Sequence, residues 1–119
     1  MNLVDTDILI EYFKKKEIEK LSGNAISIIT LMEFLRGAKD PKTVKEILED
    51  LFFVFNIDNE IIVKYIEIYR DLKTKGIAID DADLIIASTS ITKDVPLITR
   101  NLRHFERLRI YGLVLNNLF

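Results

Sequence analysis

The chain alternates short apolar runs with longer stretches in which apolar residues recur at helical spacing. The short runs predict β-strands at residues 2–5, 25–28, 53–57, 96–99 and 112–117. The longer stretches predict α-helices at residues 8–15, 17–21, 30–38, 42–52, 60–75 and 81–94, with a basic helical turn before the last strand. Strands separated by such helices form a parallel sheet. We therefore expect an α/β three-layer sandwich, with a central sheet of roughly four to five strands and helices on both faces.

Local signals mark the ends of several helices. Asp58 is a good N-cap for the long helix that follows it, and Gly76 can end that helix. The residues of the first helix expected to face inward are Ile8, Leu9, Tyr12 and Phe13. No linker interrupts the elements, so residues 1–119 are predicted to form a single domain.

Composition narrows the class of protein. Of the 119 residues, 49% are hydrophobic and 30% are charged, which is typical of a compact folded domain. No apolar run is long enough for a bilayer and no signal sequence opens the chain, so we expect no membrane contact. The absence of cysteine excludes disulfides and suits a cytoplasmic protein. With a net charge of −2, any role with nucleic acid requires a local basic patch.

Polar residues occur at places where the surrounding pattern is apolar. Asp5 follows the first predicted strand, while Thr99 and Asn101 lie at the end of a later one. Glu33 stands within an apolar helix, and Asp83 lies in the first turn of another. Parallel sheets bind ligands beyond the carboxyl ends of their strands, so these side chains are candidates for one site.

Converging carboxylates repel one another, and burying them is costly unless a cation compensates. Mg2+ or Mn2+ is the usual ion for such an all-oxygen site. Either ion can activate a water and stabilise a phosphoryl transition state, which allows phosphodiester hydrolysis without histidine. With one histidine, His104, a two-histidine ribonuclease mechanism is excluded.

Each acidic residue also has an ordinary structural explanation. Asp5 or Thr6 can cap the first helix, and Asp80 and Asp81 can be the cap and first-turn residues of a later one. Glu33, taken alone, can simply face solvent. The joint placement of the acids at strand ends and early helix turns of one α/β domain favours the metal site.

Several segments resemble the PIN-domain family, and within it the VapC-type toxins of prokaryotic toxin–antitoxin pairs. "LVDTDILIEYF" resembles the family's opening strand and Asp-Thr motif, and "AISIITLMEFLRG" resembles its Ser-x-x-Thr-x-x-Glu segment. The stretch ending in "DADLIIAS" is similar to its long helix and Asp-x-x-Ile-Ala motif, and "LITRNLRHFERL" to its closing Thr-x-Asn/Asp segment. The match in order and spacing covers essentially the whole chain.

The resemblance implies a set of catalytic residues. The family's metal-binding acids fall on Asp5 and Asp83, and its second-segment carboxylate, a third candidate ligand, falls on Glu33. The fourth catalytic position, Asp in many members, is Asn101 here, which removes a charge and implies a weaker hold on a second metal. Asp7 stands where a Ser is often found. It is either an outer-sphere acid or a first-turn helix charge, and we favour the second.

The resemblance also implies an activity and partners. The activity is that of a Mg2+- or Mn2+-dependent endoribonuclease, in which an activated water attacks phosphorus and leaves a 5′-phosphate. The implied assembly is a homodimer inhibited by a separately encoded antitoxin. This chain has no DNA-binding segment of its own, so DNA is a partner only through the antitoxin.

Contacts to the RNA substrate are expected from Thr6, Thr99, Arg100 and Arg103. The two arginines lie in a basic stretch beside Asn101, where cations can guide an RNA backbone. The alternative is a solvated amphipathic turn. For Phe105, within that turn, we favour a place in the core.

Two other classes of protein stay open. A receiver-type phospho-acceptor domain is also small and acidic at its strand ends, and Asp58 follows the third predicted strand as its acceptor would. It lacks the expected Lys after the late strand, where Arg100 stands. A catalytically silent PIN-like module is favoured by Asn101 and opposed by the retained acids, and a metal titration separates it from an enzyme.

Overall fold

The computed structural model describes residues 1–117. Within this range the strands are Leu3–Val4 (β1), Ala25–Ser27 (β2), Phe53–Phe55 (β3) and Leu97–Ile98 (β4). The α-helices are Thr6–Lys14 (α1), Ile28–Leu35 (α2), Pro41–Leu51 (α3), Asn59–Thr74 (α4), Asp81–Lys93 (α5) and Leu102–Glu106 (α6). The 3-10 helices are Ile18–Leu21 (η1) and Arg109–Tyr111 (η2).

The strands form a parallel sheet in the order β3-β2-β1-β4. Leu3 of β1 pairs with Ala25 of β2 on one side and with Leu97 of β4 on the other. The chain builds from β1 outward to β3 and then crosses to the opposite side of β1 to form β4. The predicted parallel α/β architecture is confirmed.

The last predicted strand, 112–117, is wrong as a full strand. Within the described residues this segment contributes a bridge between Leu115 and Leu97. Leu97 exchanges backbone hydrogen bonds with Val114 and Asn116, which uses up the free edge of the two-residue β4. In the part of the chain that the structure describes, the segment pairs only at this bridge, because β4 has two residues and offers no further backbone groups for a longer strand to pair with.

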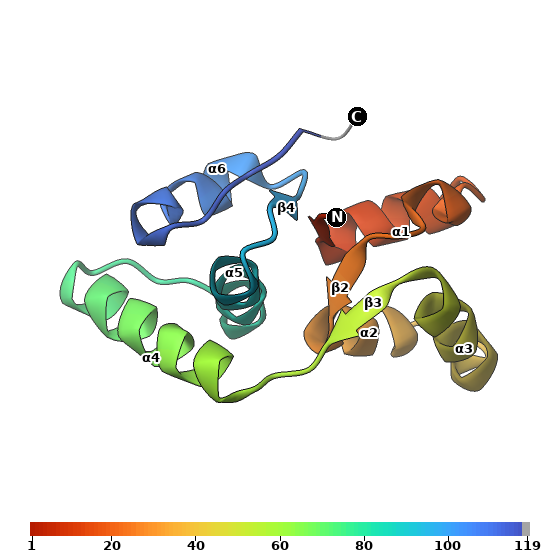
Figure 1. Ribbon diagram of the computed structural model, residues 1–119, viewed down its shortest axis with the longest axis horizontal. Helices are drawn as coiled ribbons and strands as arrows, with labels where there is room; N and C mark the ends of the chain where they lie inside the picture. Colours follow the sequence, from red (N-terminus) through yellow and green to blue (C-terminus); the bar gives the residue numbers. More distant parts are fainter. Residues whose placement is uncertain (118–119) are drawn as a thin grey trace.

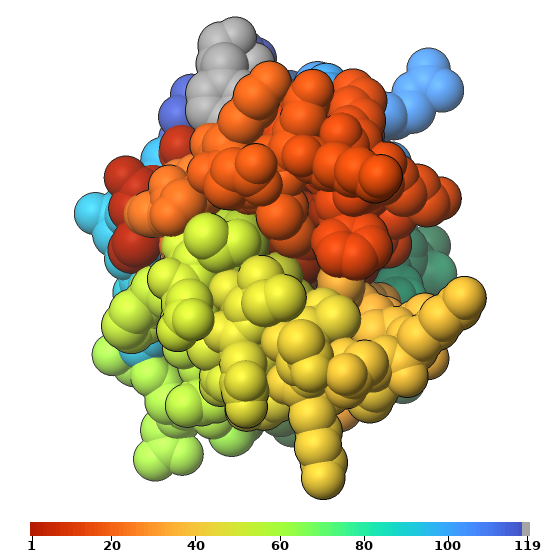
Figure 2. Space-filling view, turned by 90° about the vertical axis from the view of Figure 1, so that its right-hand side faces the viewer, coloured from red at the N-terminus to blue at the C-terminus, as the bar shows by residue number. Residues whose placement is uncertain are grey.

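The sheet separates two hydrophobic cores, because successive residues of a strand point to opposite faces. Leu3 and Leu97 pack against α4, α5 and α6 in one core, which also contains the fully buried Phe105. Val4 and Ile98 pack against α1, α2 and α3 in the other. Figure 1 shows the resulting three layers, and Figure 2 looks onto the side covered by α1 and α3.

Capping side chains set the helix starts. Both α1 and α2 begin two residues before the predicted positions, because Asp5 and Ser27 at the strand ends act as N-caps. Ser27 accepts a hydrogen bond from the backbone N–H of Ile29 at 3.1 Å, so β2 ends one residue earlier than expected. The predicted cap Asp58 and stop Gly76 (φ +70°) are confirmed.

One inward residue of α1 was predicted wrongly. Phe13 is 48% exposed and meets the edge of the Phe34 ring at a centroid distance of 5.0 Å. It lies in the last turn of the helix, beyond the part that covers the sheet. No helix within residues 1–117 has the length and apolar character needed to cross a membrane.

Candidate active site

The site lies where the strand order reverses. β1 continues into Asp5 and the adjacent β4 into Thr99, so both side chains start from the same edge of the sheet. The connection that leaves β1 leads to β2 on one side of it. The later connection, from β3, places β4 on the other side of β1. A crevice opens at such a reversal, beyond the carboxyl ends of the strands.

A cavity of about 320 Å³ fills this position. It is lined by Asp5, Thr6, Asp7, Ile10, Glu33, Arg36, Asp83 and Asn101. The four predicted catalytic residues, drawn from segments far apart in the sequence, are thus brought to a common pocket. Predicted substrate residues Thr99, Arg100 and Arg103 lie outside this lining.

Asp5 is the buried anchor of the pocket. Its Oδ1 accepts the N–H of Thr6 at 2.8 Å, and its Oδ2 accepts the hydroxyl of Thr99 at 2.7 Å. Burial raises the pKa of Asp5 to about 7, and the negative charges of Asp7 and Asp83 add to the rise, while the Thr99 hydrogen bond opposes it. The predicted N-cap role of Asp5 is confirmed, and the same side chain lines the pocket.

Glu33 faces the pocket rather than open solvent. It is half-buried, and its Oε1 accepts the hydroxyl of Thr6 at 2.8 Å. The Thr6 oxygen also lies 3.0 Å from the hydroxyl of Thr30, one turn before Glu33 on α2. The spacing of Thr30 and Glu33 puts them on one face of the helix, so Thr6 fixes the carboxylate from α1.

Asp83 enters the pocket from the first turn of α5. Burial raises the pKa of Asp83, and the charges of Asp80 and Glu33 add to the rise, while His104 opposes it. Nε2 of His104 lies 3.1 Å from Asp83 Oδ2. This contact between α6 and α5 was not predicted from the sequence.

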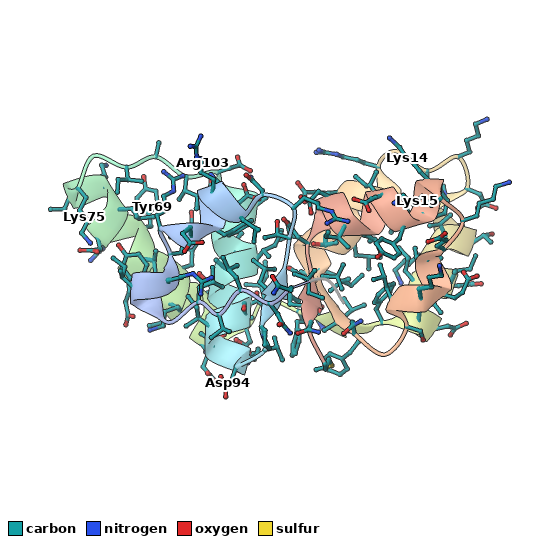
Figure 3. The ribbon with its side chains drawn as sticks, turned by 90° about the horizontal axis from the view of Figure 1, so that it is seen from above. Lys14, Lys15, Tyr69, Lys75, Asp94 and Arg103 are labelled. Carbon is teal, nitrogen blue, oxygen red and sulfur yellow. The ribbon has the colours of Figure 1, made fainter. Side chains whose placement is uncertain are left out.

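The turn after β4 is clamped to α1. The Asn101 N–H donates to the Thr99 hydroxyl at 3.0 Å, and the Arg100 N–H donates to Asp7 Oδ2 at 3.2 Å. The Arg100 guanidinium pairs with both oxygens of Glu11 at 2.9 Å, which lowers the pKa of Glu11 to about 2. Arg103, in contrast, is exposed and projects from α6 (Figure 3).

Sequence reasoning missed Arg36 and gave too little weight to Asp7, for which a role as a first-turn helix charge was favoured. Arg36, at the end of α2, lines the pocket and adds a positive charge. Asp7 also lines it, although its Oδ1 accepts the N–H of Ile8 at 2.7 Å as a first-turn residue would. Its position two residues after Asp5 was the available signal, and its backbone contact with Arg100 was not visible in the sequence.

The donor set fits a hard divalent cation. No three His, Cys, Asp or Glu side chains within residues 1–117 are placed closely enough to form a complete protein cage. Mg2+ does not need one, since it is commonly held by one or two carboxylates with waters. Buried Asp5 and half-buried Asp83 offer oxygen donors whose raised pKa values would fall if a cation neutralised the pocket.

Comparisons with known proteins agree with this geometry. The PIN domain family matches residues 3–111. Ribonuclease VapC1 of Methanocaldococcus jannaschii is 54% identical over 113 residues, covering 93% of this chain and 83% of the relative.

Solved structures share the fold. DNA-bound VapBC from Salmonella typhimurium has a TM-score of 0.81 at 26% identity and covers 98% of both chains. A toxin–antitoxin complex from Klebsiella pneumoniae has a TM-score of 0.72 at 32% identity, covering 88% of this chain and 90% of that one. The three-layer fold is therefore that of known proteins.

The burial of Asp5 predicts a specific pH dependence of stability. Between about pH 4 and pH 7 the unfolded chain has lost the Asp5 proton while the folded chain keeps it, so folding is progressively weakened as pH rises. Asp5→Asn removes this penalty. In EDTA, its free energy of unfolding should exceed that of wild type above about pH 7 by roughly 1–4 kcal/mol, and the gap should close near pH 4.

Urea denaturation across this pH range measures the effect. Asp50→Asn, which removes an exposed carboxylate from α3, is the matched control. A gap between Asp5→Asn and wild type that does not grow with pH would contradict the prediction.

Proposed function

Because the chain belongs to the PIN-domain family and its relatives are VapC ribonucleases, we propose that it hydrolyses RNA at the acidic pocket with Mg2+ or Mn2+. The observation that carries the proposal is the convergence of Asp5, Glu33, Asp83 and Asn101 at the reversal of the sheet. A pocket so rich in carboxylates repels RNA unless a cation mediates between them.

The residues have distinct proposed roles. Asp5 and Asp83 would hold the cation, which when bound supplies an activated water and screens the phosphate charge. Glu33, fixed by Thr6, is placed to accept a proton or to serve as a further ligand. The Asn101 amide can donate to a phosphate oxygen, and Arg36 adds a positive charge to the lining.

Asp58, the residue that supported a receiver-type phospho-acceptor domain, has a structural role instead. Asp58 accepts the N–H of Ile61 at 3.0 Å as the cap of α4, and it pairs with Lys93. A silent PIN-like module stays distinguishable by experiment, since it need not bind Mn2+ or cut RNA.

We also propose partners for the chain. An apolar groove of about 550 Å³ runs beside the acidic pocket and is bordered by Phe13, Phe34 and Val44. It shares Ile10 and Glu33 with that pocket, so a protein bound there would reach the pocket. An antitoxin seated in this groove, itself contacting DNA, fits the VapBC relatives.

We place the protein in the cytoplasm, where RNA and an antitoxin would meet it. Localisation of a tagged chain in its host tests that placement. The family resemblance further suggests a homodimer, and sedimentation equilibrium decides between dimer and monomer.

Removal of a pocket acid should weaken metal binding and RNA cleavage while the protein still folds. Wild type should gain about 2.7 kcal/mol of stability at Mn2+ a hundredfold above its Kd. Asp83→Asn should lose most of that gain, and its cleavage of single-stranded RNA should fall by more than about a hundredfold. Thermal melts with and without Mn2+, beside a cleavage assay, measure both, with Asp50→Asn as control. Wild-type cleavage by Asp83→Asn would refute the assignment.

The two arginines should differ in their effect on RNA binding. Arg103 is exposed, so Arg103→Ala should reduce the log–log salt slope by about 0.7 if it contacts a phosphate. Arg100 is held by Glu11, so Arg100→Ala should mainly lower stability. Salt titrations of RNA binding measure the slopes, with Lys45→Ala on α3 as control. An unchanged slope for Arg103→Ala would show that Arg103 does not contact a phosphate and is a solvated surface residue.

The groove should be needed for the antitoxin but not for the fold. Phe13→Asp puts a charge into the groove and should abolish co-purification with the product of an adjacent short reading frame. Phe53→Asp is the matched control, because Phe53 is also exposed (59%) but lies on β3. Co-purification at the wild-type level with Phe13→Asp would exclude this groove.

A further inference from the structure

The single histidine of the chain lies beside a pocket acid. His104 sits on α6, and its Nε2 lies 3.1 Å from Oδ2 of Asp83. This nitrogen is buried and makes no completed hydrogen bond within the described residues. The 3.1 Å separation is already within hydrogen-bond distance, so a small rotation of the ring or of the carboxylate completes the bond with Asp83.

The other ring nitrogen fixes the tautomer. Nη2 of Arg107 lies 3.0 Å from Nδ1 of His104. A guanidinium nitrogen can only donate, so Nδ1 must accept and the neutral ring carries its proton on Nε2. That proton faces Asp83.

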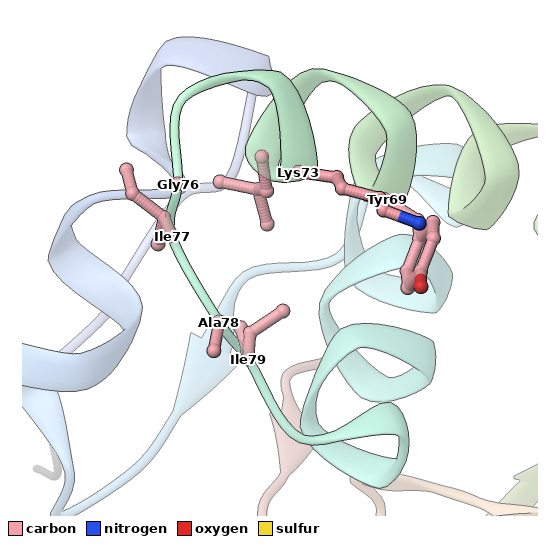
Figure 4. A pocket seen from close by; sticks show the side chains of 7 residues that line it. Tyr69, Lys73, Gly76, Ile77, Ala78 and Ile79 are labelled. Atoms are coloured by element: carbon pink, nitrogen blue, oxygen red, sulfur yellow. The ribbon is translucent and has the colours of Figure 1, made fainter.

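Arg107 is itself held in place. Its Nε donates to the backbone carbonyl of His104 at 3.1 Å, and its Nη2 donates to the carbonyl of Ala78 at 3.2 Å. Ala78 lies in the segment that joins α4 to α5, drawn in Figure 4. Arg107 therefore links the segment between α4 and α5, which leads to Asp83, with α6, which carries His104.

We propose that Arg107 and His104 form a positioning relay, in which Arg107 sets the histidine tautomer and Nε2–H of His104 orients the Asp83 carboxylate. A donor on Oδ2 leaves Oδ1 as the oxygen available to a cation, and such outer hydrogen bonds commonly tune metal-binding carboxylates. The inference rests on the proposed function in assigning Asp83 as a ligand.

A purely structural role for His104 makes different predictions. Its ring packs edge-on against Phe105 at a centroid distance of 5.4 Å, and an apolar residue could keep that contact. If packing were the whole role, His104→Leu would leave metal binding intact. The relay instead requires a donor at the position of Nε2.

The tautomer can be read directly in the metal-free protein. Because the chain has one histidine, ¹⁵N-histidine spectra need no assignment. In alkaline buffer, wild type should show a neutral ring that carries its proton on Nε2, and this proton should exchange slowly. Asp83→Ala should make that proton exchange faster, while Arg109→Ala, which removes a nearby charge paired with Glu106, should not. An Nδ1–H ring in wild type would overturn the relay.

Metal binding and kinetics test the consequence. His104→Leu should weaken Mn2+ binding in calorimetry and lower kcat, each by roughly 10- to 100-fold, with little change in KM for RNA. His104→Gln should recover much of both, since its amide N–H can replace Nε2–H. If His104→Leu keeps the Mn2+ affinity and kcat of wild type, the role of His104 is only to pack against Phe105.

The two levels of inference fail separately. If wild type neither binds Mn2+ nor cuts RNA, yet the spectra show Nε2–H protected by Asp83, the proposed function fails and the hydrogen-bonded arrangement stands. If wild type cuts RNA with Mn2+ but the ring is the other tautomer, the relay fails and the function stands.

Discussion

The pairing of β1 with β4 holds the functional end of the molecule together. Asp5 donates its N–H to the Ile98 carbonyl at 3.0 Å, and its carboxylate accepts the Thr99 hydroxyl, across a separation of 94 residues. Thr99 in turn accepts the N–H of Asn101. These bonds bring together the two segments on which the pocket depends, and the rest of the site is arranged around them.

Helix capping alone does not account for Asp5. A cap needs a single acceptor near the helix start, and Oδ1 provides it. The burial of the carboxylate and its proximity to other acids work against folding, as its raised pKa of about 7 indicates. A group that costs stability in the empty protein is best explained by a ligand that reverses the cost, since perturbed carboxylates of this kind gather at functional sites.

Sequence could predict which elements form and where their ends meet, because periodicity and strand-end polarity are local properties. Asp5, Glu33, Asp83 and Asn101 were found in this way, and all four line the pocket. Contacts between distant elements could not be found, such as the clamp of Arg100 on Glu11 or the approach of His104 to Asp83. They depend on how α1, α5 and α6 lie beside one another. The same limit explains Phe13, whose spacing is inward although no layer covers that end of α1.

The substitution of Asn for an acid at position 101 changes the pocket less than a charge count suggests. Asp7 lines the cavity as well, so the acids around it are Asp5, Asp7, Glu33 and Asp83. Asp7, on α1, thus adds to the pocket a carboxylate that the turn after β4 does not supply. At position 101 an amide offers a hydrogen-bond donor, which a phosphate oxygen can approach, whereas a carboxylate there would repel it. Under the proposed function, the carboxylates would attract the cation and Asn101 would meet the phosphate of the RNA.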